Sequence, residues 1–165
     1  AVLIVALALA SAPAAAAGRA PARRLPPPLV RAAPVPTDEL MARGLGAFKA
    51  GDHAAARRDF RQLAQRDVPA AETLLGTMSA NGQGGPRNDA VAAAWFLRAA
   101  RRGYGPAQLA LADAFARGRG VRQDLARATD LARAAAGQGQ PGAAQLAARL
   151  GPTRYAEAAI TGGRP

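Results

Sequence analysis

The chain has 165 residues with 22 basic and 11 acidic side chains, so its formal net charge is +11. It contains no cysteine, which excludes a disulfide framework and thiolate metal sites. Every basic residue except Lys49 is arginine. This bias is typical of a GC-rich genome, and it weakens any inference from net charge to a nucleic acid or another polyanion.

Residues 1–17 form an apolar run that ends in small residues, with Ala-x-Ala cleavage sites such as Ala14 to Ala16. The run is shorter than the roughly 20 residues that span a membrane, so it predicts a secretory signal peptide whose basic start lies upstream of Ala1. An uncleaved N-terminal anchor is the alternative. In either case we expect the rest of the protein to be periplasmic or secreted, with no membrane span after cleavage.

Residues 18–36 are rich in proline and arginine. Proline fixes φ and removes backbone donors, so the segment is predicted to be an extended linker between the leader and the folded part. A proline-rich recognition ligand is the alternative.

Residues 37–69 predict a leading pair of helices. Thr37 is expected to cap the first helix, and the acidic residues Asp38 and Glu39 favour a helix N-terminus. Gly51 is expected to end this helix, and Asp52 to cap the second one. The second helix places four apolar side chains on one face: Ala56, Phe60, Leu63 and Ala64.

Residues 70–105 and 106–141 repeat one helix–turn–helix pattern, so that Leu75 corresponds to Leu111 and Gly82 to Gly118, an offset of 36. Such a period is typical of stacked repeats that cover one another's apolar faces. The predicted fold class is therefore all-α, an α–α superhelix or short solenoid. Residues 142–160 predict a partial C-terminal repeat with a short closing helix, and residues 161–165 a loose tail.

Helical spacing assigns the faces of the first unit. The core side of its first helix is predicted to hold Ala71, Leu74, Leu75 and Met78, and the outer side Thr73, Thr77 and Ala80. The packed face of its second helix is predicted to hold Ala92, Trp95, Phe96 and Ala99, and the solvated side Arg98, Arg101 and Arg102. Asn88 and Asp124 are expected to cap the second helices of the two units.

The first unit carries Leu75-Gly76, Gly82-x-Gly84 and Trp95-Phe96 in that order, and it resembles a Sel-one-like repeat, a relative of the tetratricopeptide repeat. The second unit resembles this family with losses, because Ala112 replaces the glycine and Leu131-Ala132 the aromatic pair. The leading hairpin resembles a tetratricopeptide-like hairpin. The resemblance covers about half of the chain, and it implies an α-solenoid scaffold without chemistry of its own.

The sequence offers no catalytic constellation. His53 is the one histidine, and without a cysteine or a second histidine nearby we expect it to pack rather than to bind a metal or catalyse. The Gly-x-Gly loops recur between helices with no preceding strand, so they predict left-handed helix ends rather than phosphate-binding loops. We therefore expect no catalytic residue, no metal, no cofactor and no enzyme activity.

These features favour an exported, monomeric module that binds a protein or peptide partner in the cell envelope through the concave face of the solenoid. The alternative is an enzyme or accessory subunit acting on peptidoglycan or another polyanion. A nucleic-acid partner is disfavoured by export and by the few exposed aromatic side chains. In the tetratricopeptide family that the chain resembles, outward positions of successive first helices form a peptide groove. The corresponding positions here are Lys49, Thr73, Thr77, Leu109 and Asp113.

Overall fold

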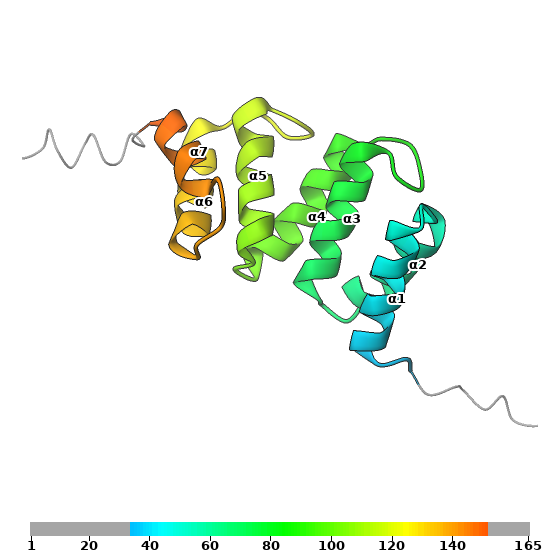
Figure 1. Cartoon of the computed structure of the whole chain (residues 1–165). Helices are drawn as coiled ribbons and strands as arrows, with labels where there is room; N and C mark the ends of the chain where they lie inside the picture. The colour runs from blue at the N-terminus through cyan, green and yellow to red at the C-terminus, as the bar shows by residue number, and fades with distance from the viewer. Residues whose placement is uncertain (1–33, 152–165) are drawn as a thin grey trace, which may run out of the picture. The chain divides into compact units, whose positions relative to one another are not determined.

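The computed structural model of the protein describes residues 34–151, in which every regular element is a helix (Figure 1). These residues hold α1 (Thr37–Lys49), α2 (His53–Ala64), α3 (Pro69–Asn81), α4 (Asp89–Arg101), α5 (Gly105–Arg117), α6 (Leu125–Gly137) and α7 (Ala143–Leu150). The predicted all-α fold is confirmed. The leader, most of the proline-rich linker and the expected closing helix fall outside the described residues. Within residues 34–151, no helix is both long and apolar enough to cross a membrane.

Helices that follow one another in the chain pack against each other, from α1 on α2 through to α6 on α7. In addition, α3 touches α5 and α5 touches α7, so the first helices of successive units lie side by side. Each unit therefore covers an apolar face of the unit before it, which is the stacking that the repeat predicts.

Side chains cap the second helix of each unit at equivalent positions. Asp52, Asn88 and Asp124 each accept a hydrogen bond from the backbone N–H three residues further on, at 2.9, 3.0 and 2.9 Å. These three predicted caps are confirmed. The predicted cap at Thr37 is wrong, because Thr37 is already the first residue of α1, Pro36 holds the cap position, and no side chain caps this helix.

The two Gly-x-Gly loops each fasten a unit to the unit before it. The first glycine of each loop is the left-handed C-cap of α3 or α5, as predicted, with φ of 70° and 65°. The second glycine lies against the first residue of the preceding second helix. A β-carbon at Gly84 would stand 2.7 Å from the His53 carbonyl oxygen, and one at Gly120 would stand 2.0 Å from that of Asp89. We call these two contacts the glycine joints.

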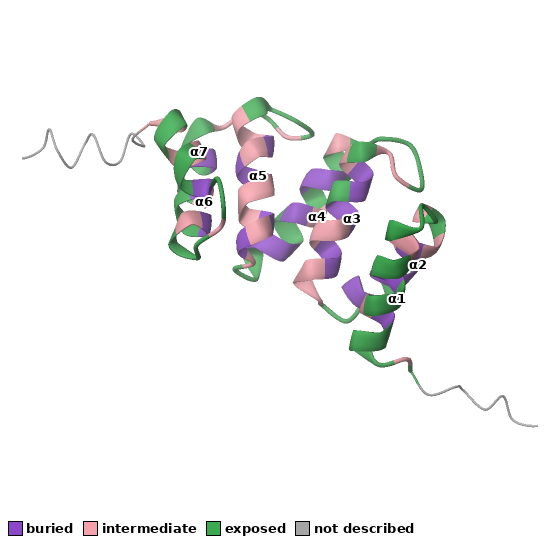
Figure 2. Ribbon diagram, in the orientation of Figure 1, coloured by how far each residue is buried: buried purple, intermediate pink, exposed green. Residues whose placement is uncertain are grey.

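The core consists of two apolar clusters made of buried helix faces (Figure 2). The first cluster contains Leu40, Ala56, Phe60, Leu63, Ala64, Ala71, Leu75 and Met78. The second contains Ala92, Phe96, Ala99, Ala100, Ala107 and Leu111. The predicted core face of α2 is confirmed at all four positions. The six positions of the second cluster correspond to six positions of the first, and the side chain is smaller at one of them, where Ala99 stands for Leu63.

Two assignments of helix faces differ from the sequence prediction. Trp95 is only half-buried; it packs against the first cluster and its ring lies 5.7 Å from the guanidinium of Arg98. Ala80, predicted to face outward, packs against the second cluster. The outward assignment assumed a single packed side for α3, whereas α3 has neighbours in α2, α4 and α5.

Candidate partner-binding surface

The five predicted partner-binding residues lie on α1, α3 and α5. Lys49 and Thr77 are exposed, whereas Thr73, Leu109 and Asp113 are half-buried. The two threonines lie one turn apart on α3, and Leu109 and Asp113 lie one turn apart on α5, which contacts α3. Lys49 is the last residue of α1.

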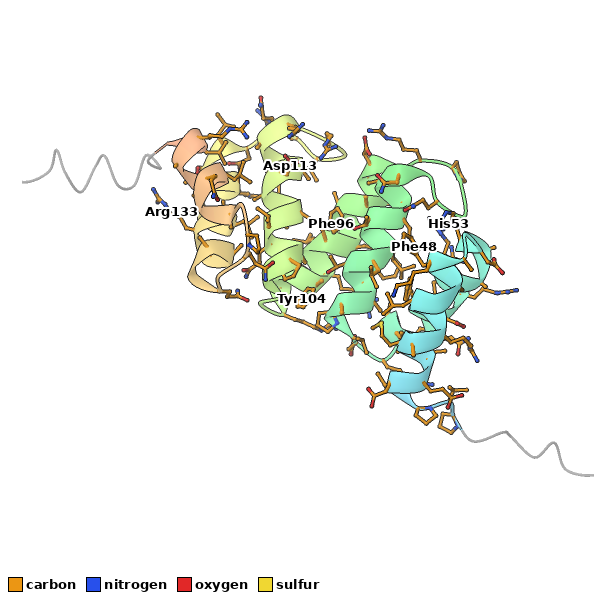
Figure 3. The ribbon with its side chains drawn as sticks, in the orientation of Figure 1. Phe48, His53, Phe96, Tyr104, Asp113 and Arg133 are labelled. Atoms are coloured by element: carbon orange, nitrogen blue, oxygen red, sulfur yellow. The ribbon has the colours of Figure 1, made fainter. Side chains whose placement is uncertain are left out.

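Most polar groups of this set are already bonded within their own segment. The Thr73 hydroxyl donates to the Pro69 carbonyl at 2.9 Å, and the Thr77 hydroxyl donates to the Thr73 carbonyl at 3.1 Å. The Asp113 carboxylate, near the C-terminal end of α5 (Figure 3), accepts a hydrogen bond from Arg117 Nε at 2.7 Å and pairs with Arg119. Binding by this surface stays a prediction.

A groove is found instead along α4, α5 and α6, and we call it the α4–α6 groove. Three cavities of about 310, 470 and 900 Å³ adjoin there, and Leu97 lines all of them. Leu97 is 38% exposed, which is high for a leucine in a packed helix. The cavity of about 310 Å³ has a mainly apolar lining that includes Leu97, Ala100, Leu111, Phe115 and Leu131.

The groove exists because the interface between the first and second units has smaller side chains than the interface between the leading hairpin and the first unit. Trp95 of α4 packs against the cluster that contains Leu63. One period later, Leu131 of α6 packs against the cluster that contains Ala99. A tryptophan and a leucine are thus replaced by a leucine and an alanine, so less side-chain volume is available to fill the space between α4 and α6.

The residues around the groove carry an excess of positive charge. The lining contains five arginines and two aspartates: Arg98, Arg101, Arg102, Arg122, Arg127, Asp124 and Asp130. Arg127 pairs with Asp124 at 3.3 Å and lies 5.7 Å from the centre of the Phe115 ring. Among the residues that the structure describes, Arg101 and Arg122 form no hydrogen bond or ion pair through their side chains.

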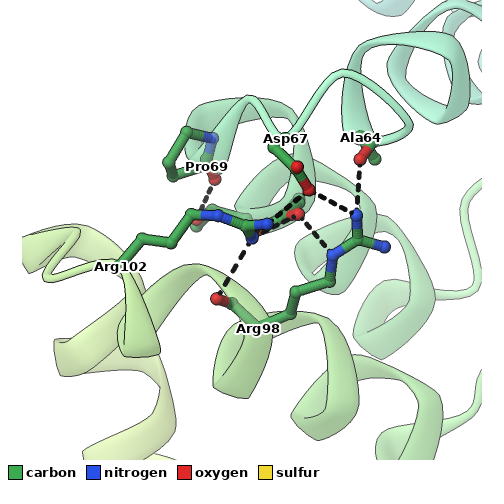
Figure 4. A network of polar contacts seen from close by, with 7 residues as sticks. Ala64, Asp67, Pro69, Arg98 and Arg102 are labelled. Carbon is green, nitrogen blue, oxygen red and sulfur yellow. Dashed lines mark hydrogen bonds and ion pairs between the residues drawn. The ribbon is translucent and has the colours of Figure 1, made fainter.

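Arg98 and Arg102 are engaged in a polar network beside the groove, around the fully buried Glu72 of α3 (Figure 4). Arg98 Nε lies 2.6 Å from Glu72 Oε1, and its Nη2 donates to the Ala64 carbonyl at 2.7 Å. Arg102 Nη1 lies 2.9 and 3.0 Å from the two carboxylate oxygens. Both arginines also pair with Asp67. Both arginines are exposed, as predicted for the solvated side of α4, but each also pairs with a buried carboxylate, which the sequence analysis did not predict.

Hydrogen bonding by Arg98 holds the pKa of Asp67 below its usual range, with the charge of Arg102 adding to the effect. Asp67 is also the one described non-glycine residue with positive φ, at 59°. The network therefore fixes the turn between α2 and α3 as well as the packing of α4.

Neither surface has the make-up of a metal site. Within residues 34–151, no group of three or more histidine, cysteine, aspartate or glutamate side chains could hold an ion. His53 packs against Phe48, with ring centroids 5.2 Å apart (Figure 3).

The Sel1 repeat profile matches residues 69–104 and 105–140, which are the segments that contain α3 with α4 and α5 with α6. The chain carries two Sel1 repeats.

Solved structures show the same helical architecture. A protective antigen of uropathogenic Escherichia coli that displays an SLR fold is 30% identical over 66% of this chain, with a TM-score of 0.63. A Sel1 repeat protein from Oxalobacter formigenes is 27% identical over 67% of this chain, with a TM-score of 0.64. The chain spans only 24% and 45% of those two proteins. No curated protein sequence matches it. Sel1 repeat proteins generally mediate protein–protein interactions and are typically non-catalytic scaffolds.

Comparison of the two Sel1 repeats explains what the sequence reasoning missed. Glu72 and Arg102 of the first repeat correspond to Gln108 and Gln138 of the second, where Gln138 Nε2 donates to Gln108 Oε1 at 2.8 Å. A charged pair in the first repeat and a neutral amide pair in the second thus occupy corresponding positions. The sequence carried a signal for this pair, because at the 36-residue offset both residues change to glutamine. The double change keeps a hydrogen-bond donor opposite an acceptor.

Proposed function

We propose that this chain is an exported, non-enzymatic, monomeric module that binds a protein or peptide partner in the cell envelope. The observation that carries binding is the α4–α6 groove, where Leu97 is exposed beside Phe115 and two arginines without partners among the described residues. Exposed apolar patches rimmed by polar residues mark interaction sites. Aromatic and arginine side chains supply much of the binding energy at such sites.

Export is supported by residues 1–17, whose apolar run ends in Ala-x-Ala. N-terminal sequencing of the protein from a periplasmic extract should give a start between Ala17 and Ala20. Recovery of the unprocessed chain from the cytoplasm alone would refute export.

Two surfaces compete as the binding face. The first is the predicted set on α1, α3 and α5, represented by the exposed Thr77. The second is the α4–α6 groove, represented by Leu97. A photo-crosslinking amino acid placed in the living cell at position 77, at position 97, or at the exposed Arg61 of α2 as a control distinguishes them.

We expect a discrete crosslinked species from position 97 that position 61 does not give. A species from position 77 alone would assign binding to the first-helix surface and leave the proposed function intact. Absence of a crosslinked species from both test positions would count against a binding module.

A further inference from the structure

We propose that the α4–α6 groove receives an acidic segment of the partner that presents one aromatic side chain. This inference rests on the proposed function and specifies the chemistry of the partner. Two separate observations carry it: the side-chain volume that the second repeat lacks, and the charge of the groove lining.

The missing volume indicates the aromatic side chain. In the first repeat, the indole of Trp95 fills the space beside α2 and α3 by packing on the first cluster. In the second repeat, Leu131 takes that position, and an open cavity of about 310 Å³ adjoins it. An aromatic side chain of a partner would contact Leu97, Leu131 and the Phe115 ring, and would bury apolar surface that now faces water.

The charge of the lining indicates the acidic flanks. Arg101 borders the apolar cavity and Arg122 borders the adjoining one, and neither has a side-chain partner among the described residues. A carboxylate can pair with each guanidinium in a bidentate manner. Complementary charge at the rim of a groove speeds association and suppresses wrong partners.

Asp130 is the acidic residue in the apolar cavity and opposes this preference. It therefore provides a test of whether the bound segment is acidic or basic. Replacing Asp130 by asparagine removes a repulsion and should strengthen binding of an acidic segment, whereas it would weaken binding of a basic one.

The probe is a short fluorescent peptide with one tryptophan flanked by glutamates, titrated against the purified full chain and followed by anisotropy. Three matched peptides replace the glutamates by glutamine, the glutamates by lysine, or the tryptophan by alanine. We expect binding by the first peptide, weaker binding by the glutamine and alanine peptides, and none by the lysine peptide.

Variants of the protein separate the groove from general attraction to a basic chain. Arg101→Glu should lower the affinity for the acidic peptide by about fivefold or more, because it removes an exposed ion pair with the peptide. Arg61→Glu makes the same charge change in α2 of the leading hairpin, at the position that corresponds to Leu97, and should leave the affinity for the peptide nearly unchanged. Leu131→Trp should fill the cavity and abolish binding, with a melting temperature at or above that of the parent chain.

If Arg101→Glu and Arg61→Glu lower the affinity for the acidic peptide equally, the attraction is non-specific and the inference is wrong. It is also wrong if the lysine peptide binds best, if no peptide binds, or if Leu131→Trp folds and still binds fully. These results leave the proposed function untouched, because crosslinking from positions 77 and 97 uses the native partner and tests it independently.

Discussion

The ring of Phe96 in α4 lies directly on the backbone of Gly76 in α3, where a β-carbon would stand 2.4 Å from Phe96 Cε1. The helices can approach this closely only because residue 76 has no side chain. In the second repeat, the corresponding residues are Ala112 and Ala132, so the glycine has gained a methyl group where the phenyl ring has been lost. The two departures of the second repeat from the Sel1 pattern therefore compensate each other.

This contact predicts that Gly76→Ala changes the free energy of unfolding in opposite directions with and without the Phe96 ring. Gly76→Ala should destabilise the chain by about 1 to 3 kcal/mol because it overpacks the contact with Phe96. In a Phe96→Ala background, the same substitution should stabilise by about 0.5 to 1 kcal/mol, the usual gain for alanine in a helix. Chemical denaturation of the four chains measures the coupling.

The control is Gly46→Ala in α1, where an added β-carbon meets nothing within 4 Å. It should stabilise in both backgrounds. Equal effects of Gly76→Ala with and without the Phe96 ring would contradict the packing described above.

A second prediction concerns the buried carboxylate of Glu72. Arg102→Gln should destabilise the chain, because it withdraws a cation from a buried charge, by about 1 to 3 kcal/mol when Arg98 still pairs with it. Adding Glu72→Gln should recover part of this loss by recreating the amide pair seen at Gln108 and Gln138. Thermal melts compare these chains.

The neighbouring Arg101 serves as the control for this prediction. Arg101→Ala should change stability by less than about 0.5 kcal/mol, as is usual for exposed side chains. An Arg102→Gln chain as stable as the Arg101→Ala chain would mean that the network contributes little.

The helices, their three side-chain caps and the core face of α2 could be predicted from the sequence, because periodicity and capping are local properties. The burial of Glu72 could not, because it depends on two arginines contributed by another helix. Trp95 was predicted to lie on the packed face of its helix; it packs against the first cluster but is only half-buried. The α4–α6 groove was also missed, since it arises from a difference in side-chain volume between two interfaces rather than from any motif.

A third prediction concerns acid stability. The hydrogen bonds that Arg43 donates to the buried Asp59, at 2.7 and 2.8 Å, lower the pKa of that carboxyl. The depressed pKa stabilises the fold above the unfolded value of about 4, and this contribution is lost as the pH falls through the folded pKa. Asp59→Asn should therefore lower stability at neutral pH and flatten its decline below pH about 4.

The parent chain provides the comparison. If the stability curve of Asp59→Asn runs parallel to that of the parent chain below pH about 4, the pair with Arg43 does not contribute to acid sensitivity.

A fourth prediction tests the glycine joints. Gly120→Ala adds a β-carbon against the Asp89 carbonyl at a residue whose φ is 70°. Gly139→Ala meets the same kind of backbone strain, with φ of 73°, but nothing lies within 4 Å. The control should lose about 1 to 2 kcal/mol from strain alone, and Gly120→Ala clearly more, as measured by urea denaturation. Equal losses would show that the joint has room to adjust.

The glycine joints also bear on how such a chain can lengthen during evolution. Each joint brings a glycine against a backbone carbonyl, at the first residue of α2 and again at the first residue of α4. The first residue is His53 in α2 and Asp89 in α4, yet each offers the same backbone carbonyl to the glycine. The contact therefore does not depend on the side chain of the first residue. The corresponding first residue of α6 is Leu125, which is 50% exposed. Tandem duplication of one whole unit would thus create a new joint of the same kind while leaving existing ones unchanged, and each copy could then diverge in its own groove.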